Sequence, residues 1–172
     1  MDRKQVISDW FHQYSDDIYR FFIYRIRPND VEDLVQDVFI RAIKGLGSFQ
    51  GNASPKTWLF SIARNVAIDE IRRRKRNKWK EHSNETNREP IDYQTPDFFL
   101  ELNEQNKRLY TTIQSLKGSY RDILILRGIN ELSTEEAASI LNWNEHKVRS
   151  TYHRAKKALQ KQLGGTNDEP SK

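Results

Sequence analysis

The stretch Thr57-Trp-Leu-Phe-Ser-Ile-Ala-Arg-Asn-Val-Ala-Ile-Asp-Glu-Ile-Arg-Arg-Arg-Lys-Arg76 decides the fold, because it predicts one uninterrupted helix with two unlike sides. On a helix, its apolar residues fall on one broad arc that must be buried against other helices. The members of this arc are Trp58, Leu59, Ile62, Ala63, Val66 and Ala67. The opposite side carries a stripe made of Ser61, Arg64, Asn65, Ile68 and Arg72, and the run Arg72–Arg76 is wholly cationic. The stretch therefore predicts a core helix with a polar face that attracts phosphate, although a solvated core helix with a basic end is an alternative.

The charge of the chain is unevenly distributed. The formal net charge is +5 over 172 residues. Residues 61–80 hold eight Lys and Arg against two acids, and residues 146–161 hold six with no acid. Two separate basic segments indicate two contact zones on a polyanion.

The composition also limits the chemistry. There is no cysteine, so a disulfide framework and a thiolate metal site are excluded. The N-terminus lacks the apolar run of a signal peptide, and no run approaches the roughly 20 residues that span a bilayer. We expect a cytoplasmic protein without a cofactor or a metal site.

The first 46 residues predict two helices. Residues 5–26 show helical periodicity, with an expected core of Ile7, Trp10, Phe11, Tyr14, Ile18, Phe21, Phe22 and Ile26. Pro28 ends this helix, and Asn29 or Asp30 caps the next. The second helix, 31–46, is expected to bury Val31, Leu34, Val35, Val38 and Ala42.

The other side of the 31–46 helix carries acids around an apolar residue. It presents Asp33, Gln36, Asp37, Ile40 and Arg41. An exposed Ile among acids is typical of a protein-contact face. The acids could instead favour the helix dipole, and the pattern leaves both interpretations open.

A polar loop, residues 48–54, precedes the 57–76 helix and is bracketed by glycines and Pro55. Loops on a rigid scaffold often carry recognition. Phe49 could anchor this loop in the core or stack on a base, and the anchor is favoured.

The composition predicts two all-α domains. Residues 80–97 lack apolar periodicity and read as a linker between domains at 1–79 and 98–163, followed by a frayed tail at 164–172. In the second domain, the pattern predicts a helix that Gly118 ends and another through Tyr120 and Ile129.

Residues 133–163 predict a helix-turn-helix. Ser133 and Glu136 form a capping box before a short helix, and Asn142-Trp-Asn144 is a tight turn. The following helix turns Val148, Tyr152, Ala155 and Leu159 inward. Its outer face carries His146, Arg149, Ser150, His153, Arg154 and Lys157, where Arg can bind guanine edges in a major groove. An ordinary helical hairpin is the alternative.

Four segments in this order resemble one family, the bacterial RNA polymerase sigma factors of the extracytoplasmic-function type in the sigma-70 family. Residues 30–41 resemble region 2.2, 57–73 regions 2.3 and 2.4, 119–127 region 4.1 and 132–157 region 4.2. The resemblance implies two helical domains, regions 2 and 4, that bind core RNA polymerase and promoter DNA. The polymerase contacts would be the clamp helices of β′ and the β flap, and relatives are usually held inactive by an anti-sigma factor, often membrane-bound.

The resemblance also implies roles for individual residues. Core polymerase would be bound by Asp33, Gln36, Asp37, Ile40 and Arg41. The melted −10 element would be read and held by Phe49, Asn52, Ser61, Arg64, Asn65, Arg72, Arg73 and Arg76. The −35 duplex would be read by His146, Lys147, Arg149, Ser150, His153, Arg154 and Lys157. The recognition helix departs from many relatives at Asn144–Lys147 and at Thr151-Tyr152, so the −35 preference transfers less well than the docking mode.

Two other functions are compatible with part of the sequence. A stand-alone helix-turn-helix regulator would bind duplex DNA without engaging polymerase, but it would not need the acidic face of 31–46. An enzyme acting on nucleic acid would need catalytic groups, whereas the four histidines are scattered and no phosphate-cradling Gly loop occurs. The sequence therefore favours a promoter-recognition subunit that takes no small-molecule substrate and has no catalytic activity.

Overall fold

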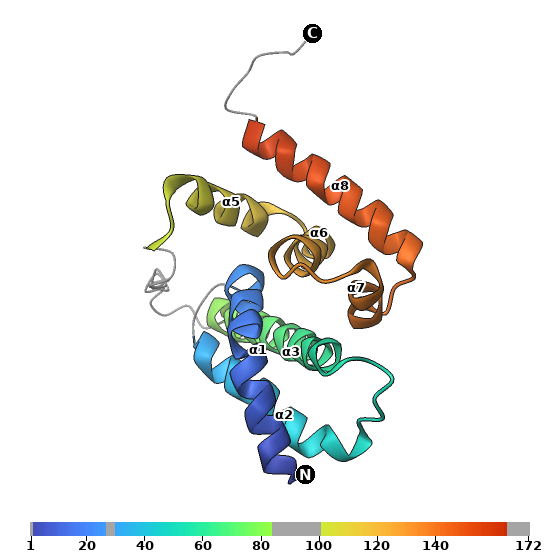
Figure 1. Cartoon of the computed structure of the whole chain (residues 1–172). Coiled ribbons are helices and arrows are strands. Elements are labelled where there is room, and N and C mark those ends of the chain that lie inside the picture. Colours follow the sequence, from blue (N-terminus) through green and yellow to red (C-terminus); the bar gives the residue numbers. More distant parts are fainter. Residues whose placement is uncertain (1, 27–29, 84–100, 165–172) are drawn as a thin grey trace. The chain divides into compact units, whose positions relative to one another are not determined.

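The computed structural model describes residues 2–26, 30–83 and 101–164, and every regular element in these ranges is a helix (Figure 1). The chain divides into two units, Met1–Gln94 and Thr95–Lys172. The first contains α1 (Arg3–Arg25), α2 (Val31–Gly45), the 3-10 helix η1 (Leu46–Ser48) and α3 (Pro55–Ser83). The second contains α5 (Glu104–Ser115), α6 (Gly118–Ile123), the π-helix η2 (Leu124–Ile129), α7 (Thr134–Leu141) and α8 (Glu145–Gly164). The expected all-α fold with two helical units is confirmed.

The core of the first unit lies where α1, α2 and α3 contact one another. Its fully buried side chains include Phe21 and Phe22 of α1, Val38 of α2, and Phe60 of α3. Phe60 lies outside the arc expected from the sequence, so the buried side of α3 is wider than the pattern indicated. Burying such aromatic side chains contributes about 1.5–3 kcal/mol each relative to leaving them exposed.

The expected core of this unit is correct only in part: Phe11 is exposed, and five other expected members are only half-buried, namely Trp10, Tyr14, Leu34, Trp58 and Ile62. Phe11 is 41% exposed, although its ring packs edge-on against that of Phe39, with the two centroids 5.0 Å apart. Leu34 is half-buried, whereas Phe39, which the pattern did not select, is buried. The face of α2 that packs on the core is therefore rotated slightly toward Phe39.

The ends of α2 and α3 also differ from expectation. Asp30 occupies the N-cap position of α2 with left-handed backbone (φ 60°), and its side chain makes no capping bond, so the expected side-chain cap is not made there; Asn29 lies outside the described residues. Helix α3 continues to Ser83, so the first residues of the expected linker, 80–83, are helical. The rest of that linker and the tail from 165 lie outside the described residues.

The core of the second unit is formed around α8, which contacts α5, α6, η2 and α7. Ile113, Ile123, Leu126 and Val148 are fully buried there. The sequence predicted that Gly118 ends a helix, and this is wrong, because Gly118 is the first residue of α6. The preceding helix, α5, already ends at Ser115, and the backbone of Leu116 is extended. The next helix is also not uniform, because α6 passes into the single π-turn of η2, marked by a bond of 2.8 Å from Asn130 N–H to the Ile125 carbonyl.

The predicted helix-turn-helix is confirmed as α7 and α8. Ser133 Oγ accepts from the N–H of Glu136 and Glu136 Oε1 accepts from the N–H of Ser133, both at 3.0 Å, which completes the capping box. Asn142 (φ 56°) takes the left-handed conformation that ends α7. Asn144 Oδ1 accepts from the N–H of Lys147 at 2.7 Å and starts α8.

The inward side of α8 differs in part from the expected one. Val148 and Ala155 are buried as expected, and Thr151 is buried as well. Tyr152 and Leu159 are half-buried, because both border an open cavity of about 270 Å³ between α5, η2 and α8. Thr151 therefore takes the place of Tyr152 on the packed side.

Candidate nucleic-acid and polymerase interfaces

Helix α2 presents an exposed face with acidic and apolar residues. Asp33 and Gln36 are exposed, and Ile40 is 49% exposed. Ile43, one turn further on, is 52% exposed and extends the apolar part of this face. The sequence reasoning missed Ile43, although its spacing of three from Ile40 places both on one side of the helix. An exposed pair of isoleucines on an otherwise polar surface suits contact with another protein.

Arg41 has a structural role on the same helix. Its guanidinium lies 3.3 Å from Asp37, one turn away, and 3.0 Å from Asp69 of α3. The second contact joins α2 to α3. Asp37 and Arg41 are therefore half-buried members of an ion-pair chain, while Asp33 and Gln36 are the more accessible of the predicted polymerase-contact residues.

The polar stripe of α3 is exposed at only part of its length. Asn65 and Arg72 are exposed, whereas Ser61, Arg64 and Ile68 are half-buried. Ser61 Oγ donates to the carbonyl of Thr57 at 3.1 Å, so its hydroxyl proton is used within the helix. The groups of the stripe that are open to a ligand are chiefly the Asn65 amide and the Arg72 guanidinium.

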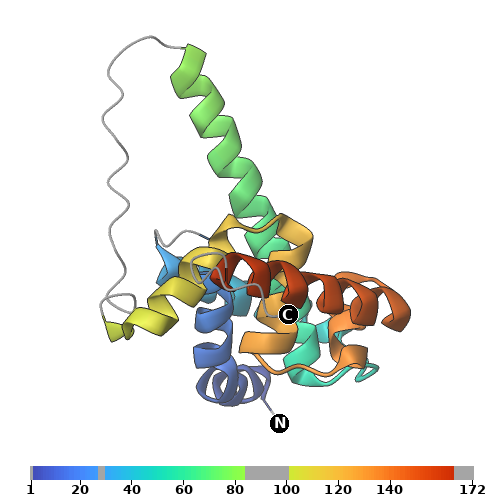
Figure 2. The same cartoon turned by 90° about the horizontal axis from the view of Figure 1, so that it is seen from above.

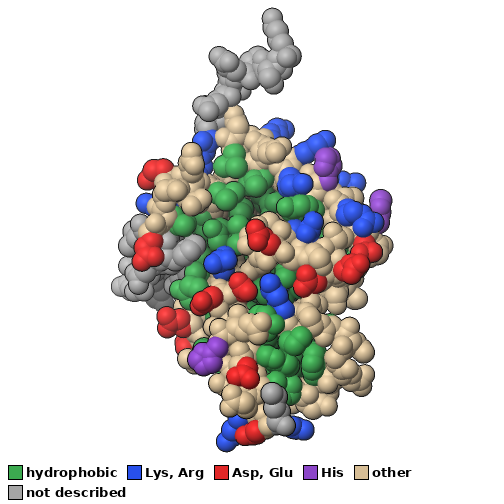
Figure 3. All heavy atoms as spheres, viewed as in Figure 1, with side chains coloured by type: hydrophobic (Ala, Val, Ile, Leu, Met, Phe, Trp, Pro, Cys, Tyr) green, Lys and Arg blue, Asp and Glu red, His purple; other side chains and the backbone are tan. Residues whose placement is uncertain are grey.

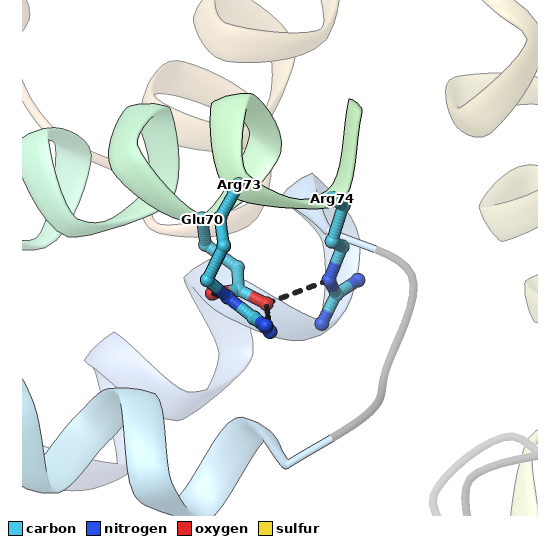
Figure 4. Close-up of polar contacts among 3 residues, drawn as sticks. All are labelled: Glu70, Arg73 and Arg74. Carbon is cyan, nitrogen blue, oxygen red and sulfur yellow. Dashed lines mark hydrogen bonds and ion pairs between the residues drawn. The ribbon is translucent and has the colours of Figure 1, made fainter. Parts of the chain in front are cut away.

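Glu70 neutralises part of the basic run (Figure 4). Its side chain is only 10% exposed and accepts from Arg73 Nε at 2.9 Å, from Arg73 Nη2 at 2.6 Å and from Arg74 Nε at 2.8 Å. The hydrogen bond from Arg73 is the main reason that the pKa of Glu70 lies below its usual range, and the same bond raises the pKa of Arg73. We call these three residues the Glu70 clasp. The sequence reasoning missed it, although the spacings of three and four from Glu70 are those of helical ion pairs.

The loop before α3 is fixed at both ends. At its start, the ring of Phe49 packs against Trp10 at 5.6 Å and Trp58 at 5.0 Å between centroids, as the anchor interpretation predicts. At its end, Ser54 Oγ accepts from the N–H of Thr57 at 3.1 Å and caps α3. Between these points Asn52 is exposed and Gly51 has φ 73°. The structure thus brings the loop next to the start of the α3 stripe and leaves its middle accessible.

The outer face of α8 is basic (Figure 3), where Lys, Arg and His side chains gather along the helix. Of the predicted −35 residues, Ser150 is half-buried and the others are exposed, namely His146, Lys147, Arg149, His153, Arg154 and Lys157. The ammonium of Lys147 lies 4.4 Å from the centre of the Trp143 ring, so the turn residue positions the first cation of the helix. This helix can present several cations to a duplex groove while its other side stays in the core.

Among the residues that the structure describes, no group of three or more His, Asp or Glu side chains is arranged to hold a metal ion. Over the same ranges, no helix is long and apolar enough to cross a membrane.

These surfaces define a helical transcription factor with two separate units, one of them a helix-turn-helix. Comparison with protein families agrees: residues 10–77 match sigma-70 region 2, and residues 106–159 match sigma-70 region 4. The chain is 34% identical to the RNA polymerase sigma factor YlaC of Bacillus subtilis, over 98% of each chain. It is 35% identical to the extracytoplasmic-function sigma factor SigX of the same organism, over 92% of this chain and 82% of SigX.

A solved structure is also similar. The sigma factor RpoE of Bartonella quintana, in complex with the anti-sigma factor NepR, matches with a TM-score of 0.72 and 26% identity, over 91% of this chain and 95% of RpoE. The chain belongs to the extracytoplasmic-function sigma factors of the sigma-70 family. It is an alternative sigma factor that binds core RNA polymerase and promoter DNA and directs transcription initiation, and the stand-alone regulator is not favoured.

Proposed function

We propose that the exposed face of α2 binds core RNA polymerase, at the clamp helices of β′. Its residues are Asp33, Gln36, Asp37, Ile40 and Arg41, and we include Ile43 because it is exposed one turn from Ile40. The carboxylates of Asp33 and Asp37 suit a basic partner surface, and the two isoleucines supply apolar area that becomes buried on binding. Arg41 acts mainly by holding Asp37 and joining α2 to α3.

We propose further that α3 and the loop before it hold the melted −10 element. Asn65, Arg72 and Asn52 are exposed and suited to contact bases and phosphates. Ser61, Arg64 and Phe49 support this surface from partly buried positions. Arg73 offers less positive charge to DNA than Arg76, because the guanidinium of Arg73 is hydrogen-bonded to the carboxylate of Glu70. The side chain of Arg76 is exposed.

In the second unit, α8 is proposed to read the −35 element in the major groove. Arg149 and Arg154 can bind guanine edges bidentately, while the histidines and lysines add phosphate contacts. The observation that carries this assignment is the sidedness of α8: Val148, Thr151 and Ala155 are buried on one side, and the basic residues are exposed on the other. The second unit would also contact the β flap of the polymerase.

The protein is proposed to work in the cytoplasm and to have no catalytic activity of its own. RpoE of Bartonella quintana was solved with the anti-sigma factor NepR. By analogy, an anti-sigma factor, which could be membrane-bound, would hold this chain inactive.

Two substitutions in the full chain test these roles. Asp33→Arg should weaken co-elution with core polymerase at least about tenfold, because it reverses a charge on the contact face. Asp33 is preferable to Asp37, whose loss would also disturb Arg41. Arg154→Ala should leave core binding unchanged and should cost the holoenzyme about 1–3 kcal/mol of preference for the intact −35 sequence.

The readouts are size-exclusion co-elution with core and run-off transcription from promoters with intact or altered −35 elements. Ser139→Ala, an exposed change on α7, serves as the control. If both substitutions impaired both functions equally, the division of labour between the units would be wrong. If the wild-type chain added no promoter-specific transcript, all of the proposed residue roles would fail.

A further inference from the structure

Trp79, near the end of α3, is unusually exposed. Its side chain is 75% exposed, compared with 41–52% for Phe11, Ile40 and Ile43, the other exposed large hydrophobic side chains that the structure describes. Placing an indole in water forgoes the burial that normally stabilises it. None of the proposed polymerase and promoter contacts uses this residue.

The cations around Trp79 share its side of the helix. At about 100° per residue, Arg72, Lys75 and Arg76 precede Trp79 by seven, four and three positions and lie on the same face. All three are exposed. We call Arg72, Lys75, Arg76 and Trp79 the terminal face of α3. Residues 71–80 contain no acid that could offset its charge.

The Glu70 clasp lies on the other side of α3. Glu70 precedes Trp79 by nine positions, which is half a turn from it on a helix with about 3.6 residues per turn. Its carboxylate takes up the charge of Arg73 and Arg74, which lie on the same side as Glu70. Glu70 therefore neutralises cations that lie outside the terminal face. The cations beside Trp79 can still bind an anionic ligand.

The terminal face is also accessible within the first unit. Figure 2 shows the last turns of α3 standing clear of α1 and α2, and every residue from 75 to 80 is exposed. Trp79 is 14 positions from Asn65, so the two lie about 21 Å apart along the axis at ~1.5 Å per residue. Trp79 and Lys75 thus extend the proposed −10 surface beyond Asn65, while Arg72 and Arg76 belong to both.

We propose that the terminal face of α3 is a sequence-independent binding site for single-stranded DNA. An unpaired base would stack on the indole of Trp79, while Lys75 and Arg76 contact the adjoining phosphates. A cationic track with an aromatic side chain is the usual composition of such sites, and stacking tolerates every base because each has a π-face. The site deepens the proposed function, because a protein that melts a promoter has unpaired strand to hold.

The composition of the terminal face argues against a membrane surface. Helices that lie in a membrane interface bury a broad apolar face beneath their cations. Here a single indole follows three cations on the same face, and the flanking positions are Lys78 and Lys80. One aromatic group among cations matches a base and its phosphates better than it matches acyl chains.

The test measures binding of the full chain to a labelled oligothymidylate about 12 nucleotides long, within the ~4–16 nucleotides that single-strand sites span. This oligonucleotide has no promoter motif. Trp79→Ala should weaken its binding about 5- to 140-fold, the range expected for loss of one stacked base. Trp79→Phe should recover most of the affinity.

Salt dependence separates stacking from charge. Lys75→Ala and Arg76→Ala should each reduce the slope of log affinity against log salt by about 0.7, the value for one phosphate contact on a single strand. Trp79→Ala should lower affinity and leave that slope unchanged. Asn77→Ala on the side of α3 away from Trp79 and Lys44→Ala on α2 are the matched controls, and both should bind like the wild type.

Several results would overturn the proposal: no measurable binding by the wild type, equal binding by wild type and Trp79→Ala, or no recovery with Trp79→Phe. Loss of binding to anionic phosphatidylserine vesicles in Trp79→Ala, with oligothymidylate binding intact, would assign the face to a membrane instead. Run-off transcription distinguishes this site from the proposed function. If the wild type directed promoter-specific transcription but Trp79→Ala did not change oligothymidylate binding, only the terminal-face proposal would be rejected. If Trp79→Ala weakened oligothymidylate binding but the wild type gave no promoter-specific transcript, the residue roles under the proposed function would be rejected.

Discussion

At the scale of single residues, Glu70 shows how one acid changes the meaning of a basic run. The sequence presents five consecutive cations at 72–76, and the resemblance assigns Arg72, Arg73 and Arg76 to the −10 DNA. The structure places two of the five, Arg73 and Arg74, on the nearly buried carboxylate of Glu70. The positive charge that this run offers to a polyanion is therefore smaller than a count of its residues suggests. It is also concentrated on the side of α3 away from Glu70.

Glu70→Gln should lower the free energy of unfolding by about 1–2 kcal/mol at neutral pH, because hydrogen bonds to a charged group are partly lost. Since the folded-state pKa of Glu70 lies below its ordinary value of 4.5, the stabilisation is present above about pH 4.5 and disappears as pH falls through the folded-state pKa. The difference between the wild type and Glu70→Gln should therefore shrink below that pH. Urea titrations at pH 7 and pH 4 measure it, with the exposed Glu101→Gln as the control. If the difference in unfolding free energy between the two proteins stayed constant with pH, the charge of Glu70 would not be the source of the stabilisation.

The Glu70 clasp could have been found from the sequence by testing each acid for cations three and four positions away. What the sequence could not supply is burial, because Glu70 becomes costly to leave unpaired only when its surroundings exclude water. Phe11 illustrates the opposite case. Its helical position is that of a core residue, but its ring is 41% exposed although it contacts Phe39 of α2.

At the scale of elements, the ends of helices were predictable where side chains make the cap. The capping box of α7 was expected from Ser133 and Glu136 and is confirmed. Gly118 was wrongly assigned as a helix end, because a glycine is equally compatible with the beginning of the next helix. The apolar pattern of Leu124–Ile129 did not distinguish the π-turn of η2 from an α-helix, since both bury residues such as Leu124, Ile125 and Leu126.

Ser133→Ala should destabilise the second unit by about 1 kcal/mol, because it removes the side-chain bond to the N–H of Glu136. Thermal or urea unfolding followed by circular dichroism measures the change. Ser139→Ala, an exposed position inside α7, is the matched control and should be neutral or slightly stabilising. Equal destabilisation by both substitutions would mean that the cap contributes nothing specific.

At the scale of the whole molecule, two separate cores account for the organisation of the chain. The sequence anticipated two units because apolar periodicity stops after Trp79 and returns later. The exact boundaries could not be predicted, since the polar segment Lys80–Ser83 has no apolar pattern and yet continues α3. The roles assigned to individual site residues remain predictions for the experiments above.

Because each unit has its own core, the two should unfold in separate steps. Trp10, Trp58 and Trp79 lie in the first unit and Trp143 in the second. Glu70→Gln should therefore shift the transition seen by tryptophan fluorescence, while Ser133→Ala should shift mainly a second component seen by circular dichroism. A single transition that moves equally in both variants would show that the units unfold as one cooperative body.

The way in which the loop between Phe49 and Ser54 is held affects which substitutions can accumulate there during evolution. Both ends are secured, one by aromatic packing with Trp10 and Trp58 and the other by the cap on α3. Between them, Gln50 and Asn52 are exposed, and a Cβ at Gly51 would meet nothing within 4 Å. Because Gln50 and Asn52 are exposed, substitutions there should cost little stability, and under the −10 role proposed for this loop they would alter promoter preference.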